Sequence, residues 1–187
     1  MTQDPNRPTV AFRGATEIAR GPLLEIALML RAAGLDAEGV LVFDDATGAV
    51  IDLDLRGDAE AVAARLTPPA RPRPRGRPKL GVTAREVTLL PRHWAWLAAQ
   101  PGGASAALRR LVEEAARADG GETATRAARE AAYRFLTALA GDLPGYEAAI
   151  RALFAGDVAG FAARMEGWPE DIRAHALRLA ETPPPAA

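Results

Sequence analysis

The sequence predicts an α+β fold, and three patterns along its 187 residues support this prediction. Residues 8–66 contain short apolar runs typical of strands, together with two amphipathic helical stretches. Residues 67–82 hold five prolines and two glycines, which exclude a regular helix or a central strand. Residues 122–181 show apolar side chains at helical spacing throughout. We therefore expect a small α/β unit, a Pro-rich linker and a helical domain.

The first segment predicts the element order β-α-β-β-α. Pro22 suits the first turn of a helix that extends to Gly34. Asp52 and Asp54 alternate with aliphatic residues, as in a strand with one buried face. Asp58 is a typical N-cap for the helix that follows. The expected strands lie at 8–14, 40–43 and 50–55, with a hairpin turn at 44–48, and the expected helices lie at 22–34 and 59–66.

The central segment, residues 83–118, predicts one short strand and two helices. Residues 85–90 favour an extended strand, and Pro91 suits the first turn of the first helix. The run Gln-Pro-Gly-Gly ends that helix, and Ser105 is a favourable N-cap for the second. The fourth segment, 122–181, predicts three or four short helices. Two of them should end at Gly141 and Gly156, and Asp157 should cap the start of the next one.

The charge of the chain is concentrated in one place. Residues 71–92 carry seven basic side chains and one acid, a net charge of +6. Because the whole chain has a net charge of −1, the remaining residues together carry about −7. Such a separation indicates an anionic partner at the basic segment. The lack of cysteine excludes disulfides and thiolate metal sites. No signal peptide or membrane-spanning run is visible, so we expect a soluble, cytoplasmic protein that does not bind membranes.

The central segment resembles the ribbon-helix-helix repressors over about 40 residues. In that family a strand is followed by Leu-Pro and a helix, and Ser-x-x-Leu-Arg opens the second helix. Leu90-Pro91 and Ser105 to Arg109 match these two patterns. The resemblance implies a homodimer whose paired strands enter the major groove of double-stranded DNA. It also implies that the start of the second helix binds a phosphate, with Ser105 and Arg109 as contacts.

The register of the expected ribbon stays open. The position before Pro91 should point inward, which would place Arg85 outward toward the bases. The natural alternation instead buries Val87 and Leu89 and places Thr88 outward. Either a bulge at Leu89-Leu90 resets the register, or the strand is an ordinary part of the fold.

The linker also resembles an AT-hook. The run "PRGRPK", residues 74–79, has the Gly-Arg-Pro centre that lies in a narrow A·T minor groove and inserts arginine into it. A solvated basic linker is the alternative interpretation of the same run. We call this basic linker, residues 67–82, the arm. Its candidate DNA contacts are Arg71, Arg73, Arg75, Arg77 and Lys79.

The whole chain resembles one bacterial family, a domain of unknown function numbered 2239. The resemblance is carried by "LVFDDATGAVIDLDLRG", by residues 76–115, by "AYRFLTALAGDLPGYEAAIRALFAGD" and by "WPEDIRAHALRLA". It covers nearly all of residues 8–181. It implies relatedness and no particular activity.

Three functional hypotheses remain. The first is a DNA-binding transcriptional regulator, without cofactor, metal or catalytic residues. The second is a protein-interaction or structural protein whose basic arm contacts an acidic surface. The third is an enzyme that holds a divalent cation on Asp44, Asp45, Asp52 and Asp54, although a solvated sheet face and a turn also explain these carboxylates. His93 and His175 are single histidines in separate helices, which makes them a weak metal set.

Overall fold

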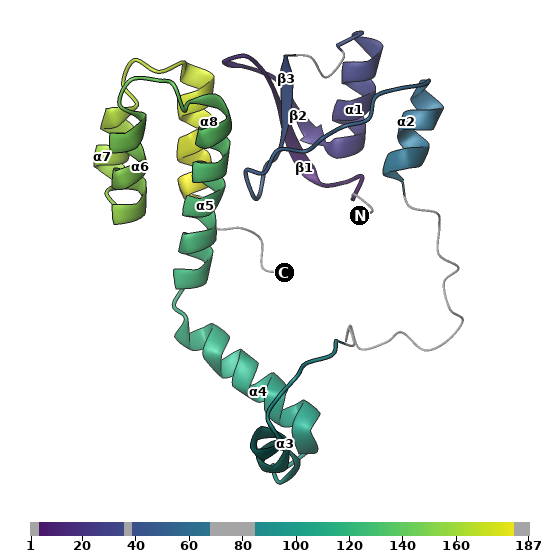
Figure 1. Ribbon diagram of the computed structural model, residues 1–187, viewed down its shortest axis with the longest axis vertical. Helices are drawn as coiled ribbons and strands as arrows, with labels where there is room; N and C mark the ends of the chain where they lie inside the picture. Colours follow the sequence, from purple (N-terminus) through teal and green to yellow (C-terminus); the bar gives the residue numbers. More distant parts are fainter. Residues whose placement is uncertain (1–3, 36–38, 68–84, 182–187) are drawn as a thin grey trace. The chain divides into compact units, whose positions relative to one another are not determined.

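The computed structural model describes residues 4–35, 39–67 and 85–181. In these ranges it contains eight helices and a three-stranded antiparallel sheet, which confirms the predicted α+β class (Figure 1). The sheet has the order β2-β1-β3, with β1 at Pro8–Arg13, β2 at Thr16–Pro22 and β3 at Val40–Asp44. The helices are α1 (Leu23–Ala32), α2 (Ala59–Leu66), α3 (Pro91–Ala98), α4 (Gly103–Ala118), α5 (Glu122–Leu139), α6 (Tyr146–Ala155), α7 (Val158–Arg164) and α8 (Glu170–Glu181).

The chain forms two compact units. Unit 1 contains residues 1–69 together with residues 123–187, and unit 2 contains residues 70–122. Unit 1 therefore combines the α/β segment with the C-terminal helices, although unit 2 separates them in the sequence. Unit 2 contains α3 and α4.

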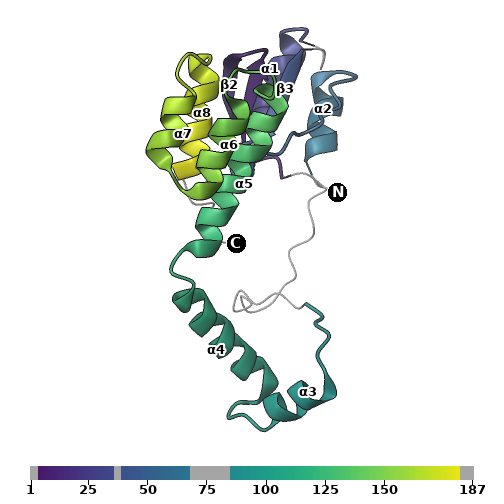
Figure 2. The ribbon, with the colours of Figure 1, turned by 60° about the vertical axis from the view of Figure 1, so that its left-hand side comes forward.

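The sheet of unit 1 is buried on both faces because helices pack against each of them. On one face Phe12 and Phe43 pack against Phe135 of α5, with ring centroids 5.2 and 5.0 Å apart. On the other face Ala11 and Val42 pack against α1 and α2. Figure 2 shows the sheet between these two groups of helices. Alternate side chains of β1 thus serve two different cores, as the two-residue period of a strand requires.

Several local predictions are confirmed. The Asp58 side chain accepts a hydrogen bond from the Ala61 N–H and caps α2, and Asp157 caps α7 in the same way through Gly160. Pro91 lies in the first turn of α3. Gly156 ends α6 in the left-handed conformation, with φ of 76°.

Strand β2 was not predicted, because its sequence lacks a regular alternation. It pairs with β1 through the tight turn at Gly14, and a bulge shifts the register between Ala11 and Phe12. The bulge places an extra residue in β2, so apolar side chains do not recur at every second position.

The predicted strand at 50–55 is wrong beyond its first residues. An isolated bridge joins Phe43 and Val50, and the Ile51 N–H donates to the Val42 carbonyl at 2.7 Å. From residue 52 onward the segment has no strand pairing in the described chain. The side-chain alternation persists, because Leu53 is buried while Asp52 and Asp54 are exposed.

Three boundaries in the later segments also differ from prediction. Residues 85–90 are not a strand in the described chain. Gly102, in the left-handed conformation, occupies the N-cap of α4, so Ser105 lies inside the first turn instead of capping it. Helix α5 ends at Leu139, and Gly141 is not among the glycines with positive φ, so it is not the expected C-terminal glycine.

Candidate nucleic-acid interface

Unit 2 is built around the start of α3. Leu90 has an extended backbone at the N-cap, and Pro91 follows in the first turn, where a missing N–H costs no helical hydrogen bond. The Leu90 carbonyl accepts from the N–H groups of His93 and Trp94 at 2.9 and 3.2 Å. The Leu-Pro pair therefore converts an extended chain into a helix over one residue.

A glycine turn joins α3 to α4. Gly102 and Gly103 both have positive φ, at 80° and 75°, which other residues rarely adopt. A Cβ on Gly102 would also lie 2.9 Å from the Cβ of Ala106. The Gly103 N–H donates to the Gln100 carbonyl at 2.9 Å. The turn thus fixes where α4 begins, with Ala104 and Ser105 in its first turn.

Ser105 and Arg109 lie together on α4, as the sequence predicts. The Arg109 Nε donates to the Ser105 carbonyl at 3.2 Å, and both side chains are exposed. A helix start carries partial positive charge and N–H groups without helical partners. Ser105 and Arg109 can therefore contact one anionic group from adjacent turns. Arg85 and Thr88 are exposed on the segment that precedes α3, and the arm residues Arg71, Arg73, Arg75, Arg77 and Lys79 lie outside the described residues.

The charge of unit 2 comes from the arm. Residues 85–122 contain five arginines balanced by five carboxylates, whereas residues 70–84 contain five basic residues and no acid. One of those carboxylates, that of Glu114, lies beside an arginine on α4. Glu114 is 3.9 Å from Arg110, and the Glu113 carbonyl accepts from Arg117. Any strong attraction for a polyanion therefore depends on the basic residues of 70–84.

Unit 2 has a very small core of its own. In its described part only Leu97 and Ala107 are buried. Large apolar side chains stay exposed on both helices and on the segment before them, and Trp96 and Val112 are 52 % and 65 % exposed. The full set is Val87, Leu90, Trp94, Trp96, Leu111 and Val112. Trp94 and Trp96 of α3 therefore lie on the surface of the single chain.

Three carboxylates of the acidic cluster, those of Asp44, Asp45 and Asp54, take part in separate ion pairs. Asp44 lies 3.4 Å from Arg7, Asp45 lies 2.6 Å from Arg20, and Asp54 lies 2.8 Å from Arg56. Asp44 also accepts hydrogen bonds from the N–H groups of the turn that follows it. The described residues contain no group of three or more His, Asp or Glu side chains able to hold a metal ion.

His175 takes part in a buried polar cluster in unit 1. Its ring packs against Phe12 and Phe135, with centroids 5.7 and 4.4 Å away. Its Nδ1 lies 3.0 Å from a guanidinium nitrogen of Arg20 and 2.6 Å from one of Arg178. Guanidinium groups only donate hydrogen bonds, so Nδ1 accepts and the proton of the neutral ring is on Nε2. His93, in contrast, is exposed.

The surroundings of His175 oppose its protonation. Burial lowers the pKa of His175 to about 3, and the positive charges of Arg178 and Arg20 act in the same direction, while Glu17 opposes them. The ring is therefore neutral at physiological pH and serves as an acceptor that joins β2 to α8. No sequence signal connects Arg20 with His175, because 155 residues separate them.

Comparison with known proteins assigns the chain to a family. A family model described as "Uncharacterized protein conserved in bacteria (DUF2239)" matches residues 8–180. The chain belongs to this family. No curated protein and no solved structure matches it.

Membership in DUF2239 covers both units, since the match begins at β1 and reaches α8. The matched range includes the basic arm as well as α3 and α4. Among the described residues, no helix of the chain is both long and apolar enough to cross a membrane.

Proposed function

We propose that this chain is a non-enzymatic DNA-binding protein that regulates transcription, and that unit 2 is its DNA-binding part. The observation that carries the proposal is the five-residue basic excess in residues 70–84, placed directly before a small helical unit with exposed apolar side chains. A segment of this charge attracts the phosphates of DNA over a long range and makes the association salt-dependent.

We infer that a second copy of the chain covers these exposed apolar residues. Units of this size need additional burial to be stable. In the ribbon-helix-helix arrangement, residues 85–90 of two chains pair as strands and the helices pack together. That arrangement supplies the strand pairing that a single chain lacks and covers Trp94, Leu111 and Val112. It also presents alternate side chains of 85–90, including Arg85 or Thr88, to the major groove.

The start of α4 supplies the phosphate contacts in this proposal. Ser105 and Arg109 are exposed on adjacent turns, next to N–H groups that have no helical partner. These contacts position the protein on the duplex, while the arm adds affinity and a preference for A·T-rich minor grooves.

The test measures duplex binding by fluorescence anisotropy over a range of salt concentrations. Replacing Arg75, Arg77 and Lys79 with Ala should weaken binding and flatten the dependence of log affinity on log salt by up to about 2.7, at about 0.9 per lost phosphate contact. The matched control replaces three exposed arginines of unit 1, namely Arg13, Arg126 and Arg151, which changes the net charge equally.

Equal losses in the two triple variants would show that net charge matters and the arm does not. Unchanged binding in the arm variant would remove the arm from the mechanism. A wild-type chain that binds no duplex even at low salt would favour the protein-interaction function, in which the exposed tryptophans of α3 contact a protein partner.

A further inference from the structure

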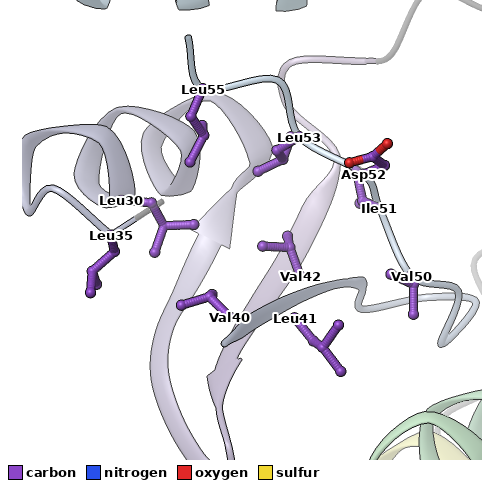
Figure 3. A pocket seen from close by; sticks show the side chains of 10 residues that line it. All are labelled: Leu30, Leu35, Val40, Leu41, Val42, Val50, Ile51, Asp52, Leu53 and Leu55. Atoms are coloured by element: carbon purple, nitrogen blue, oxygen red, sulfur yellow. The ribbon is translucent and has the colours of Figure 1, made fainter. Parts of the chain in front are cut away.

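An apolar cavity of about 220 Å³, partly open to solvent, lies in unit 1. Its walls come from the end of α1, from β3 and from residues 50–55 (Figure 3). Ten of the described residues line it, of which nine are leucine, isoleucine or valine and the tenth is Asp52. In Figure 3 the Asp52 carboxylate points away from the side to which Leu53 points. The interior of the cavity is therefore aliphatic.

The cavity exists because the hairpin at residues 40–55 opens. Near its turn the hairpin is closed, since the Asp44 N–H donates to the Ala49 carbonyl at 2.9 Å and the Ile51 N–H donates to the Val42 carbonyl. Beyond Ile51 the described chain shows no further strand pairing. Leu53 and Leu55 nevertheless remain on one wall and face Val40 and Val42 of β3.

The far wall is held in place by arginines from two helices. Arg65 of α2 donates to the Asp54 carbonyl at 3.0 Å and also to the Arg56 carbonyl. Arg31 of α1 donates to the Gly57 carbonyl at 2.7 Å. These bonds direct the backbone of residues 54–57 toward the helices instead of toward β3. The opening is thus fixed by specific hydrogen bonds at both ends of the segment.

The chemistry of the walls selects an apolar occupant. Water against these aliphatic walls finds few hydrogen-bond partners, whereas an apolar molecule buries its surface against them. Benzene fits into apolar cavities of about 150 Å³, so a space of 220 Å³ has room for a ring with a small substituent. No basic side chain is among the described residues that line the cavity, so none of them compensates a negative charge.

We propose that this cavity is a binding site for a small, uncharged apolar molecule, of the size of a substituted benzene ring or a short branched hydrocarbon chain. The site lies wholly within unit 1 and does not depend on the DNA-binding function of unit 2.

Methyl NMR of the full chain, labelled at Ile, Leu and Val methyl groups and titrated with toluene, tests the proposal. We expect saturable shifts at Val42, Leu53 and Leu55, with no shift at Leu136 and Leu153 of the other core of unit 1. Benzoate, which has the same ring with a carboxylate, should bind at least about tenfold more weakly, because its charge would be desolvated without a partner.

Two variants fill the cavity from partly exposed positions, where a larger side chain is tolerated. Leu55→Trp and, separately, Val50→Phe should each weaken toluene binding by about tenfold or more, because the new ring occupies the same space. The matched control, Val158→Phe, changes an exposed valine of unit 1 outside this cavity and should leave binding unchanged.

If Leu55→Trp does not fold, the Val50→Phe variant gives the same information. Shifts spread equally over both cores, toluene binding that survives in both folded variants, or benzoate binding as tight as toluene binding would each overturn the proposal.

Discussion

Acidification should destabilise unit 1 through His175. The imidazole is fully buried, and burial together with Arg178 and Arg20 lowers its pKa to about 3 in the folded chain. In the unfolded chain the pKa returns to about 6.5. Because the folded-state value is the lower one, the stabilisation is complete above pH 6.5 and is lost as the pH falls from 6.5 toward 3.

The size of the effect follows from proton linkage. At pH 5 the unfolded chain is mostly protonated at this histidine and the folded chain is not, which lowers the free energy of unfolding by about 2 kcal/mol relative to pH 8. Most of a typical domain stability of about 5–15 kcal/mol would remain, so the chain should still be folded at pH 5.

Urea denaturation at pH 8 and pH 5, followed by circular dichroism, measures this effect. His175→Gln supplies the control, since its amide oxygen can accept the arginine hydrogen bonds without titrating. From pH 8 to pH 5, the free energy of unfolding of the wild type should fall by about 2 kcal/mol more than that of His175→Gln. His93→Gln, at an exposed position, should follow the wild type. A wild-type and a His175→Gln curve that stay parallel over this pH range would refute the reasoning.

Three further predictions concern the packing of Phe135 in unit 1, the N-cap of α2 and the exposed surface of unit 2. Phe135→Ala should lower the free energy of unfolding by about 3–5 kcal/mol in urea denaturation, because this ring joins the sheet to the C-terminal helices, and a loss under about 1 kcal/mol would contradict the shared core. Asp58→Ala should cost about 1 kcal/mol in the same assay through loss of the α2 cap, whereas Asp58→Asn should cost little. Val112→Glu should shift the chain toward the monomer in sedimentation velocity, whereas Val158→Glu, at a valine of similar exposure, should not; a Val112→Glu chain that stays dimeric would place the interface elsewhere.

Local signals in the sequence predicted the elements that depend on local chemistry. Asp58 and Asp157 were recognisable as caps because the capping bond spans three residues. Pro91 and Gly156 marked helix ends for equally local reasons. Strand β2 escaped prediction because its bulge breaks the alternation, and residues 50–55 resemble a strand because their side chains alternate although their backbone leaves β3.

Long-range features had no comparable signal. The packing of Phe12 and Phe43 on Phe135 joins two segments that unit 2 separates in the sequence. The contact between Arg20 and His175 is equally distant in sequence. In unit 2, nothing in the sequence of α4 indicates that Leu111 and Val112 stay exposed in the single chain.

The most direct test of the central claim is the binding of the wild-type chain to two duplexes, one A·T-rich and one G·C-rich. Fluorescence anisotropy at low and moderate salt gives the affinities, and a titration at high duplex concentration gives the stoichiometry. The account predicts two chains per duplex, a steep loss of affinity with salt and tighter binding to the A·T-rich duplex. A chain that is monomeric in light scattering and leaves the anisotropy of both duplexes unchanged at low salt would contradict it.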